Sequence, residues 1–119
     1  MRWAALGMLL LMPSAFFAQQ ETELASGAVL RALDKLNGEV VDLSLANREI
    51  ADFGPLTIRL TECRYPSGNR SGDAFAGLEI TDRTRSELLF QGWMIASAPA
   101  LSAMDHPRYD IWVLRCASS

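Results

Sequence analysis

Apolar and polar residues alternate along much of the chain after residue 38, which is the pattern of β-strands that bury one face. In the segment 39–45, Val41, Leu43 and Leu45 fall on one side, with polar or charged residues between them. Two further segments repeat this alternation, 56–60 and 74–80. The sequence therefore predicts at least three strands that each contribute one face to a core.

Residues 28–36 fit two structures. Four apolar residues could share one helical face: Val29, Ala32, Leu33 and Leu36. Such a helix could end at Asn37-Gly38, but the same Asn-Gly pair is also a strong hairpin signal. We prefer the hairpin, because the strand at 39–45 needs a partner.

Polar segments and one parity change mark the middle of the chain. Asn47-Arg48 predicts a turn, although arginine suits a position of positive φ poorly. Cys63 has the opposite parity to the inward residues of strand 56–60, so either a bulge near Thr61 turns it inward or it faces the other side. Residues 65–73, rich in Pro, Gly, Asn and Ser, predict a surface loop.

The most apolar segment of the second half is 88–95, which follows a charged turn at 81–87. We predict that it forms a central strand buried on both faces. Gly92 inside this segment indicates a bulge or a close backbone approach.

A short helical turn is predicted next, with Ser97 as its cap, Pro99 near its first position, and Leu101 and Met104 pointing the same way. His106-Pro107 ends this turn.

The last predicted strand is 109–116, which places Tyr109, Ile111 and Val113 on one face and Trp112 and Leu114 on the other. Taken together, the pattern predicts a mainly β protein. We expect a small single-domain barrel or sandwich of five or six antiparallel strands with one short helical turn.

The N-terminus has the build of a secretory signal peptide. Arg2 precedes an uncharged run, Trp3 to Phe17, that is short for a membrane-spanning helix, which needs about 20 apolar residues. We expect cleavage after Ala18, with Ala15 as a weaker site and an uncleaved anchor or a buried helix as the alternatives. The mature chain would then consist of a flexible lead-in at 19–27 and one β-rich domain at 28–119, located in the periplasm without a stable membrane anchor.

Charge excludes some partners. The whole chain has a net charge of −3, and removal of the signal peptide, which carries Arg2 and no acidic residue, makes it −4. Nonspecific nucleic-acid binding needs a basic face, and docking on anionic lipid needs basic clusters. We therefore expect neither partner.

Cys63 and Cys116 are the only cysteines. In an exported chain they predict a structural disulfide. A redox pair usually has the spacing Cys-x-x-Cys, and a zinc site needs three or four ligands, whereas His106 is the only histidine. We therefore expect no metal and no cofactor.

A hydrolase would require His106 as base, Ser97 or Ser102 as nucleophile and Asp110 to orient the histidine. The sequence has no Gly-x-Ser-x-Gly motif, and carboxylate pairs, calcium loops and phosphate-binding motifs also lack the spacing that their chemistry needs. We prefer a structural interpretation, in which Asp105-His106-Pro107 ends the helical turn and His106 bonds to the backbone. The sequence thus predicts no enzyme, and a small hydrolase is the alternative.

Aromatic residues are the remaining candidates for binding. Trp93 and Trp112 lie in apolar surroundings, so we expect both in the core; if exposed, they could stack on sugars or anchor a protein. The candidate binding surface is the segment from Trp93 to Trp112, with these residues: Trp93, Ser97, His106, Tyr109 and Trp112. A sheet edge is a second possible docking site.

Three stretches are similar to a known family: Leu33-Asp-Lys-Leu-Asn-Gly-Glu39, Phe53-Gly-Pro-Leu-Thr-Ile58 leading to Cys63-Arg-Tyr65, and Gly92 to Cys116. They resemble the bacterial domain-of-unknown-function 2155 family across the mature chain. The resemblance implies an exported envelope protein with the same cysteine pair and no established activity. Asn47-Arg48 departs from the glycine-containing turn of that family.

These observations lead to a functional hypothesis. We expect a periplasmic binding or accessory module without catalysis, whose partner is another envelope protein or a cell-wall glycan. A structural subunit of an envelope complex is a further alternative.

Overall fold

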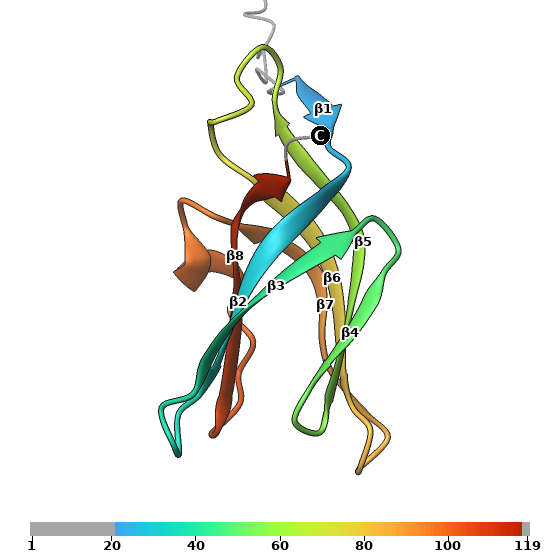
Figure 1. Cartoon of the computed structure of the whole chain (residues 1–119), viewed down its shortest axis with the longest axis vertical. Coiled ribbons are helices and arrows are strands. Elements are labelled where there is room, and N and C mark those ends of the chain that lie inside the picture. Colours follow the sequence, from blue (N-terminus) through green and yellow to red (C-terminus); the bar gives the residue numbers. More distant parts are fainter. Residues whose placement is uncertain (1–20, 118–119) are drawn as a thin grey trace, which may run out of the picture.

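The computed structural model describes residues 21–117, so the predicted signal peptide at 1–18 lies outside the described residues. This part of the chain forms eight strands and one short 3-10 helix (Figure 1). In chain order these are β1 Thr22–Leu24, β2 Gly27–Asp34, β3 Val40–Ala46, β4 Ile50–Phe53, β5 Leu56–Pro66, β6 Phe75–Asp82, β7 Glu87–Ile95, η1 Pro99–Ser102 and β8 Tyr109–Ala117. The prediction of a mainly β protein is confirmed, with more strands than the expected five or six.

The strands form two antiparallel sheets in a sandwich-like arrangement. Sheet A has the order β1-β5-β6-β7, and β4 pairs with the first half of β5. Sheet B has the order β3-β2-β8. In Figure 1 the lower ends of the strands spread into two arms, one with the β2–β3 hairpin and the start of β8, the other with the β4–β5 and β6–β7 turns.

The core lies between the two sheets. The largest fully buried side chains come from both of them: Leu30, Leu56, Ile58, Leu60, Cys63, Leu78, Ile80, Ile111 and Val113. These residues point inward from strands whose apolar and polar residues alternate. Each large aliphatic side chain among them stabilises the fold by about 1.5–3 kcal/mol. The alternation predicted for 56–60, 74–80 and 109–116 is therefore confirmed.

Residues 28–36 take the hairpin and not the helix, since β2 pairs with β3 from Gly27↔Ala46 to Leu33↔Val40. The turn is longer than the predicted two-residue Asn-Gly turn. The Asp34 carboxylate accepts a hydrogen bond from the backbone N–H of Leu36 (3.0 Å), and the Asn37 side chain accepts one from the N–H of Glu39 (2.8 Å). Such side-chain bonds stabilise a wider loop, and Gly38 supplies its positive φ of 76°.

The segment predicted as a flexible lead-in belongs to the fold where it is described. Residues 22–24 form β1 and pair with residues 64–66 of β5, and Ala25 is buried. The side-chain amide of Asn47 donates a hydrogen bond to the carbonyl of Ala25 (2.7 Å). The surface loop predicted from residue 65 begins later, because β5 continues to Pro66 and Tyr65 is buried.

The prediction of a central, doubly buried strand at 88–95 is wrong. β7 pairs only with β6 and forms the edge of sheet A, where Leu88 and Trp93 are 53% and 47% exposed. The bulge expected at Gly92 occurs instead at Leu89, which is passed over between the pairs Phe90↔Ile80 and Leu88↔Thr81. An apolar run does not distinguish a strand buried inside its own fold from an apolar strand at an edge.

A bulge at Thr61 orients the first cysteine, as one of the two predicted alternatives required. The β5–β6 register skips Thr61 between Leu60↔Leu78 and Glu62↔Gly77, which turns the fully buried Cys63 side chain inward. Cys63 forms a disulfide with Cys116, and their Cα atoms are 5.7 Å apart. The bond links β5 of sheet A to β8 of sheet B.

Replacing both cysteines with alanine is expected to lower the free energy of unfolding by about 4 kcal/mol, because the disulfide closes a loop with a sequence separation of 53. The measurement is urea unfolding of the oxidised protein and of the double variant. Reduced wild-type protein is the control and should match the variant. A loss below about 1 kcal/mol would contradict an entropic role for this bond.

Candidate functional site

The five residues predicted as a binding surface do not form one site. Trp93 lies on β7 opposite Gly77, and Trp112 lies on β8 opposite Arg31, so the two tryptophans belong to different sheets. Neither belongs to the buried core, which corrects the expectation that both do. Tyr109 is buried, and Ser97 and His106 lie in the segment that joins β7 to β8.

His106 stabilises the turn before β8. Its Nδ1 accepts hydrogen bonds from the backbone N–H groups of Arg108 (3.0 Å) and Tyr109 (3.1 Å). Its backbone carbonyl accepts a hydrogen bond from Lys35 Nζ (2.7 Å). The ring also lies 5.3 Å from the Tyr109 ring, centroid to centroid. The predicted backbone role of His106 is therefore confirmed.

Ser97 is bound to a different partner. Its hydroxyl donates to one carboxylate oxygen of Asp73 (2.5 Å) and its backbone N–H donates to the other (2.9 Å). Burial raises the pKa of Asp73, but the hydrogen bonds from Ser97 and from the N–H of Ala74 outweigh it and leave that pKa below its ordinary value. Ser97 thus joins the β5–β6 loop to the end of β7. It does not cap η1 as predicted, because the N-cap is Ala98, which has no side-chain bond.

A two-bond ion pair joins the end of β2 to the residue before β8. Asp34 is 4% exposed, and its carboxylate accepts two hydrogen bonds from the Arg108 guanidinium (3.0 and 2.8 Å). The Arg108 guanidinium also lies 5.1 Å from the centroid of the Tyr109 ring. Arg108 holds the pKa of Asp34 below its ordinary value; burial opposes this, and the backbone N–H groups of Leu36 and Asn37 support it.

This ion pair lines a cleft of about 470 Å³ between the β2–β3 hairpin and β4. Phe53 and Tyr109 meet edge to face there, with ring centroids 5.8 Å apart. Gly54 has a φ of 55°, and a Cβ at this position would lie 3.0 Å from the Tyr109 hydroxyl oxygen. All three stretches that carry the family resemblance contribute residues to this cleft. Within the lining, Asp34 and Arg108 bond to each other, and the Asn37 side chain bonds to the backbone of Glu39.

A more apolar groove of about 300 Å³ separates η1 from β8. Its lining is Pro99, Ala100, Ala103, Asp110, Ile111 and Trp112. Leu101 of η1 is 77% exposed, while Met104 is buried, so these two side chains do not point the same way as predicted. We call Leu101 and the groove lining the η1 surface.

The η1 surface belongs to the longest uncharged part of the domain. Residues 88–104 contain no charged side chain, and they run from β7 through η1. Within them Leu88, Trp93 and Leu101 are exposed. Depletion of charged residues is a property of the centre of a protein interface. The absence of charge in residues 88–104 is visible in the sequence, but an apolar run alone also predicts a buried strand.

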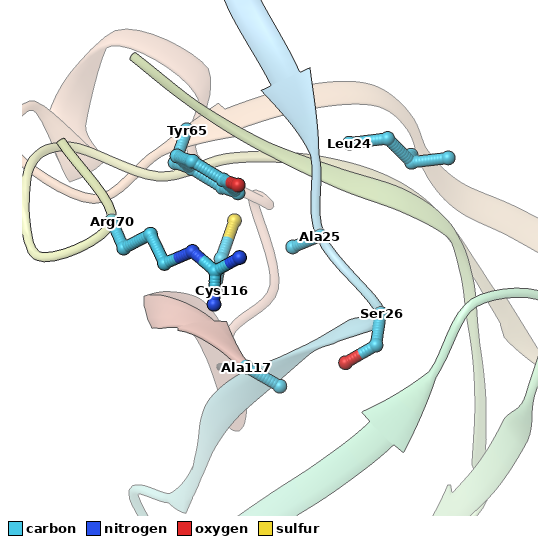
Figure 2. A pocket seen from close by; sticks show the side chains of 7 residues that line it. All are labelled: Leu24, Ala25, Ser26, Tyr65, Arg70, Cys116 and Ala117. Carbon is cyan, nitrogen blue, oxygen red and sulfur yellow. The ribbon is translucent and has the colours of Figure 1, made fainter. Parts of the chain in front are cut away.

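A second, small cavity lies beside the disulfide (Figure 2). Its volume is about 50 Å³, and its lining is Leu24, Ala25, Ser26, Tyr65, Arg70, Cys116 and Ala117. In Figure 2 the Arg70 side chain extends from the β5–β6 loop toward the Cys116 sulfur. The volume suits a water-sized molecule and lies well below the several hundred Å³ typical of ligand sites.

No helix within residues 21–117 has the length and apolarity needed to cross a bilayer. No three His, Cys, Asp or Glu side chains of these residues gather closely enough to hold a metal ion.

Fold and surface define a class of protein, a small β-sandwich with one disulfide between its sheets and an uncharged stretch at one edge. Residues 28–116 match the family model described as "Uncharacterized protein conserved in bacteria (DUF2155)", and the chain belongs to this family.

An uncharacterised protein of Rickettsia prowazekii (strain Madrid E) is 33% identical over 88 residues, which cover 71% of this chain and 57% of that protein. The chain thus spans little more than half of that relative. No solved structure matches the chain.

Asp34→Asn is expected to destabilise the protein at neutral pH. The pKa of folded Asp34 lies below the unfolded value of about 3.9, so the ionised carboxylate stabilises the fold above that pH. The difference from wild type should shrink as the pH falls below about 4 and through the lower folded pKa.

Urea unfolding at neutral pH and near pH 3 measures this difference. Asp42→Asn is the matched control, because Asp42 pairs with Arg31 (2.8 Å) in an exposed position and should lose less. An equal loss for Asp34→Asn at both pH values would contradict the role of its ionised form.

Proposed function

We propose that this protein is a non-catalytic accessory module that binds another exported protein through the η1 surface. The observation that carries the proposal is the uncharged segment 88–104, which places Leu101 in solvent beside an apolar groove. A soluble domain rarely keeps such a side chain exposed next to further apolar surface unless a partner covers it.

The lining of the groove favours a protein partner over a sugar. Pro99, Ala100, Ala103 and Ile111 offer no side-chain hydrogen-bond groups, and Asp110 is the only charged residue of the lining. An apolar side chain of the partner fits this lining, with Trp112 beside it. Aromatic residues at the centre of an interface commonly contribute much of its binding energy.

We further propose that the protein is exported and that residues 1–18 are removed. The basic start and the uncharged run at 3–17 support this proposal, as does the pairing of both cysteines. Disulfides form and persist in oxidising compartments such as the bacterial periplasm. The partner is therefore expected among envelope proteins.

Leu101→Asp is expected to abolish partner binding, because it places a charge at the centre of the η1 surface. The tagged full chain is expressed in its native host and cross-linked in intact cells, and the bound proteins are identified by mass spectrometry. Val40→Asp is the matched control, since Val40 is also exposed (53%) but lies on β3.

A partner that is captured by wild type and Val40→Asp and lost with Leu101→Asp would support the proposal. A partner retained equally by all three forms would overturn the assignment of the η1 surface. The absence of any reproducible partner would overturn the docking function itself.

The proposed export predicts a mature chain that begins at Gln19. Mass spectrometry of the tagged protein from the periplasmic fraction measures its N-terminus. A protein that keeps residues 1–18 and stays with the membrane fraction would contradict cleavage.

A further inference from the structure

Trp93 lies on the outer face of sheet A and is not among the residues that line the groove beside η1. Across the three strands β7, β6 and β5, it is opposite Gly77, which is opposite Glu62. Its side chain is nearly half exposed. No other large aromatic side chain among the described residues is so exposed.

The Trp93 ring packs against the backbone of Gly77. A Cβ at position 77 would lie 3.6 Å from Cη2, the far end of the Trp93 ring, and would collide with Thr61 Oγ1. The indole therefore reaches across its neighbouring strand and packs over a residue without a side chain. One part of the ring contacts the sheet and the rest faces solvent, which forms a low aromatic platform.

Hydrogen-bonding side chains flank this platform. The next row of the same face is Gln91↔Glu79↔Arg59, from β7 to β5. Its members offer an amide, a carboxylate and a guanidinium, and each can form two hydrogen bonds in one plane.

The face as a whole is close to neutral. Glu62 is paired with Arg64 (3.0 Å), and Glu79 lies opposite Arg59 in the sheet register. A neutral ligand with many hydroxyl groups therefore suits this face better than an ion or a charged polymer. Two aliphatic side chains are also exposed on this face: Ile50, opposite Arg59 in the flanking row, and Leu88, opposite Thr81.

We propose that Trp93 and its flanking row bind a cell-wall glycan. The apolar C–H face of a pyranose ring stacks on the indole, and its hydroxyl groups bond to Gln91 and Glu79. This site is distinct from the η1 surface, so the protein can hold a glycan and a protein partner at the same time. A cell-wall source follows from the proposed export, whereas the sugar chemistry rests on the platform itself.

The test uses the mature, disulfide-linked protein with Trp112→Phe, in which Trp93 is the only tryptophan because Trp3 lies in the signal peptide. Tetra-N-acetylchitotetraose is added while the emission of Trp93 is recorded. Purified peptidoglycan sacculi provide a second probe, measured by co-sedimentation. The expected result is a saturable change in emission and sedimentation of the protein with the sacculi.

Trp93→Ala, assayed by co-sedimentation, is expected to weaken binding by roughly tenfold or more, which is the scale of one lost stacking contact. Trp93→Phe should keep part of the affinity, and Leu101→Asp, the variant that tests the η1 surface, should bind like wild type. If Trp93→Ala fails to fold, Gln91→Ala decides instead, since it keeps the ring and removes one hydrogen-bonding partner.

Failure of both probes to bind would overturn the proposal, and so would equal binding by wild type and Trp93→Ala. If Gln91→Ala is the deciding variant, undiminished binding overturns the proposal as well. Loss of glycan binding with Leu101→Asp would place the ligand on the η1 surface and also overturn the assignment to Trp93.

Discussion

The link between the two sheets depends on one irregular residue. Because Thr61 is skipped in the β5–β6 ladder, Cys63 turns into the core, where it meets Cys116 of the last strand. Without that bulge the cysteine would face outward and could not reach its partner. One end of the sandwich is thus closed covalently, in a domain whose core is small enough for such a bond to matter.

The opposite end is held together by different forces. There the Asp34–Arg108 ion pair joins the end of β2 to the residue before β8, within one arm. His106 fixes the turn that carries Arg108, and Tyr109 packs against Phe53 beneath it. A bidentate pair with a nearly buried carboxylate specifies geometry more than it adds net stability. The contact that joins the two arms is the edge-to-face packing of Phe53 on Tyr109, and the disulfide links the two sheets.

Much of the sandwich follows from local pattern, and most of the surface does not. Alternation located 39–45, 56–60, 74–80 and 109–116, because a half-buried strand leaves a period of two. β1 is only three residues long and leaves no such period. The apolar run at 88–95 does not predict the exposure of β7, because a strand buried in its own fold and an apolar strand at a sheet edge have the same pattern.

The same ambiguity placed both tryptophans in the core. Trp93 is exposed on the outer face, where its ring packs over Gly77 of the neighbouring strand. This contact between two strands leaves no signal in the local sequence pattern. His106 was interpreted correctly, since a lone histidine beside a proline at the end of a turn has backbone groups within reach. Among the candidate binding residues, His106 is predictable because it bonds to its sequence neighbours, whereas the exposure of the tryptophans depends on other strands.

The pairing of β2 with β8 imposes an order in time. β2 begins at Gly27 and β8 ends at Ala117. β2, the middle strand of sheet B, therefore cannot pair with β8 until almost the whole domain has been synthesised. Neither sheet B nor the disulfide between Cys63 and Cys116 can therefore be completed before the last strand has been made. Until then the edge of β2 that β8 later covers is unpaired, and an unpaired strand edge can pair with other chains.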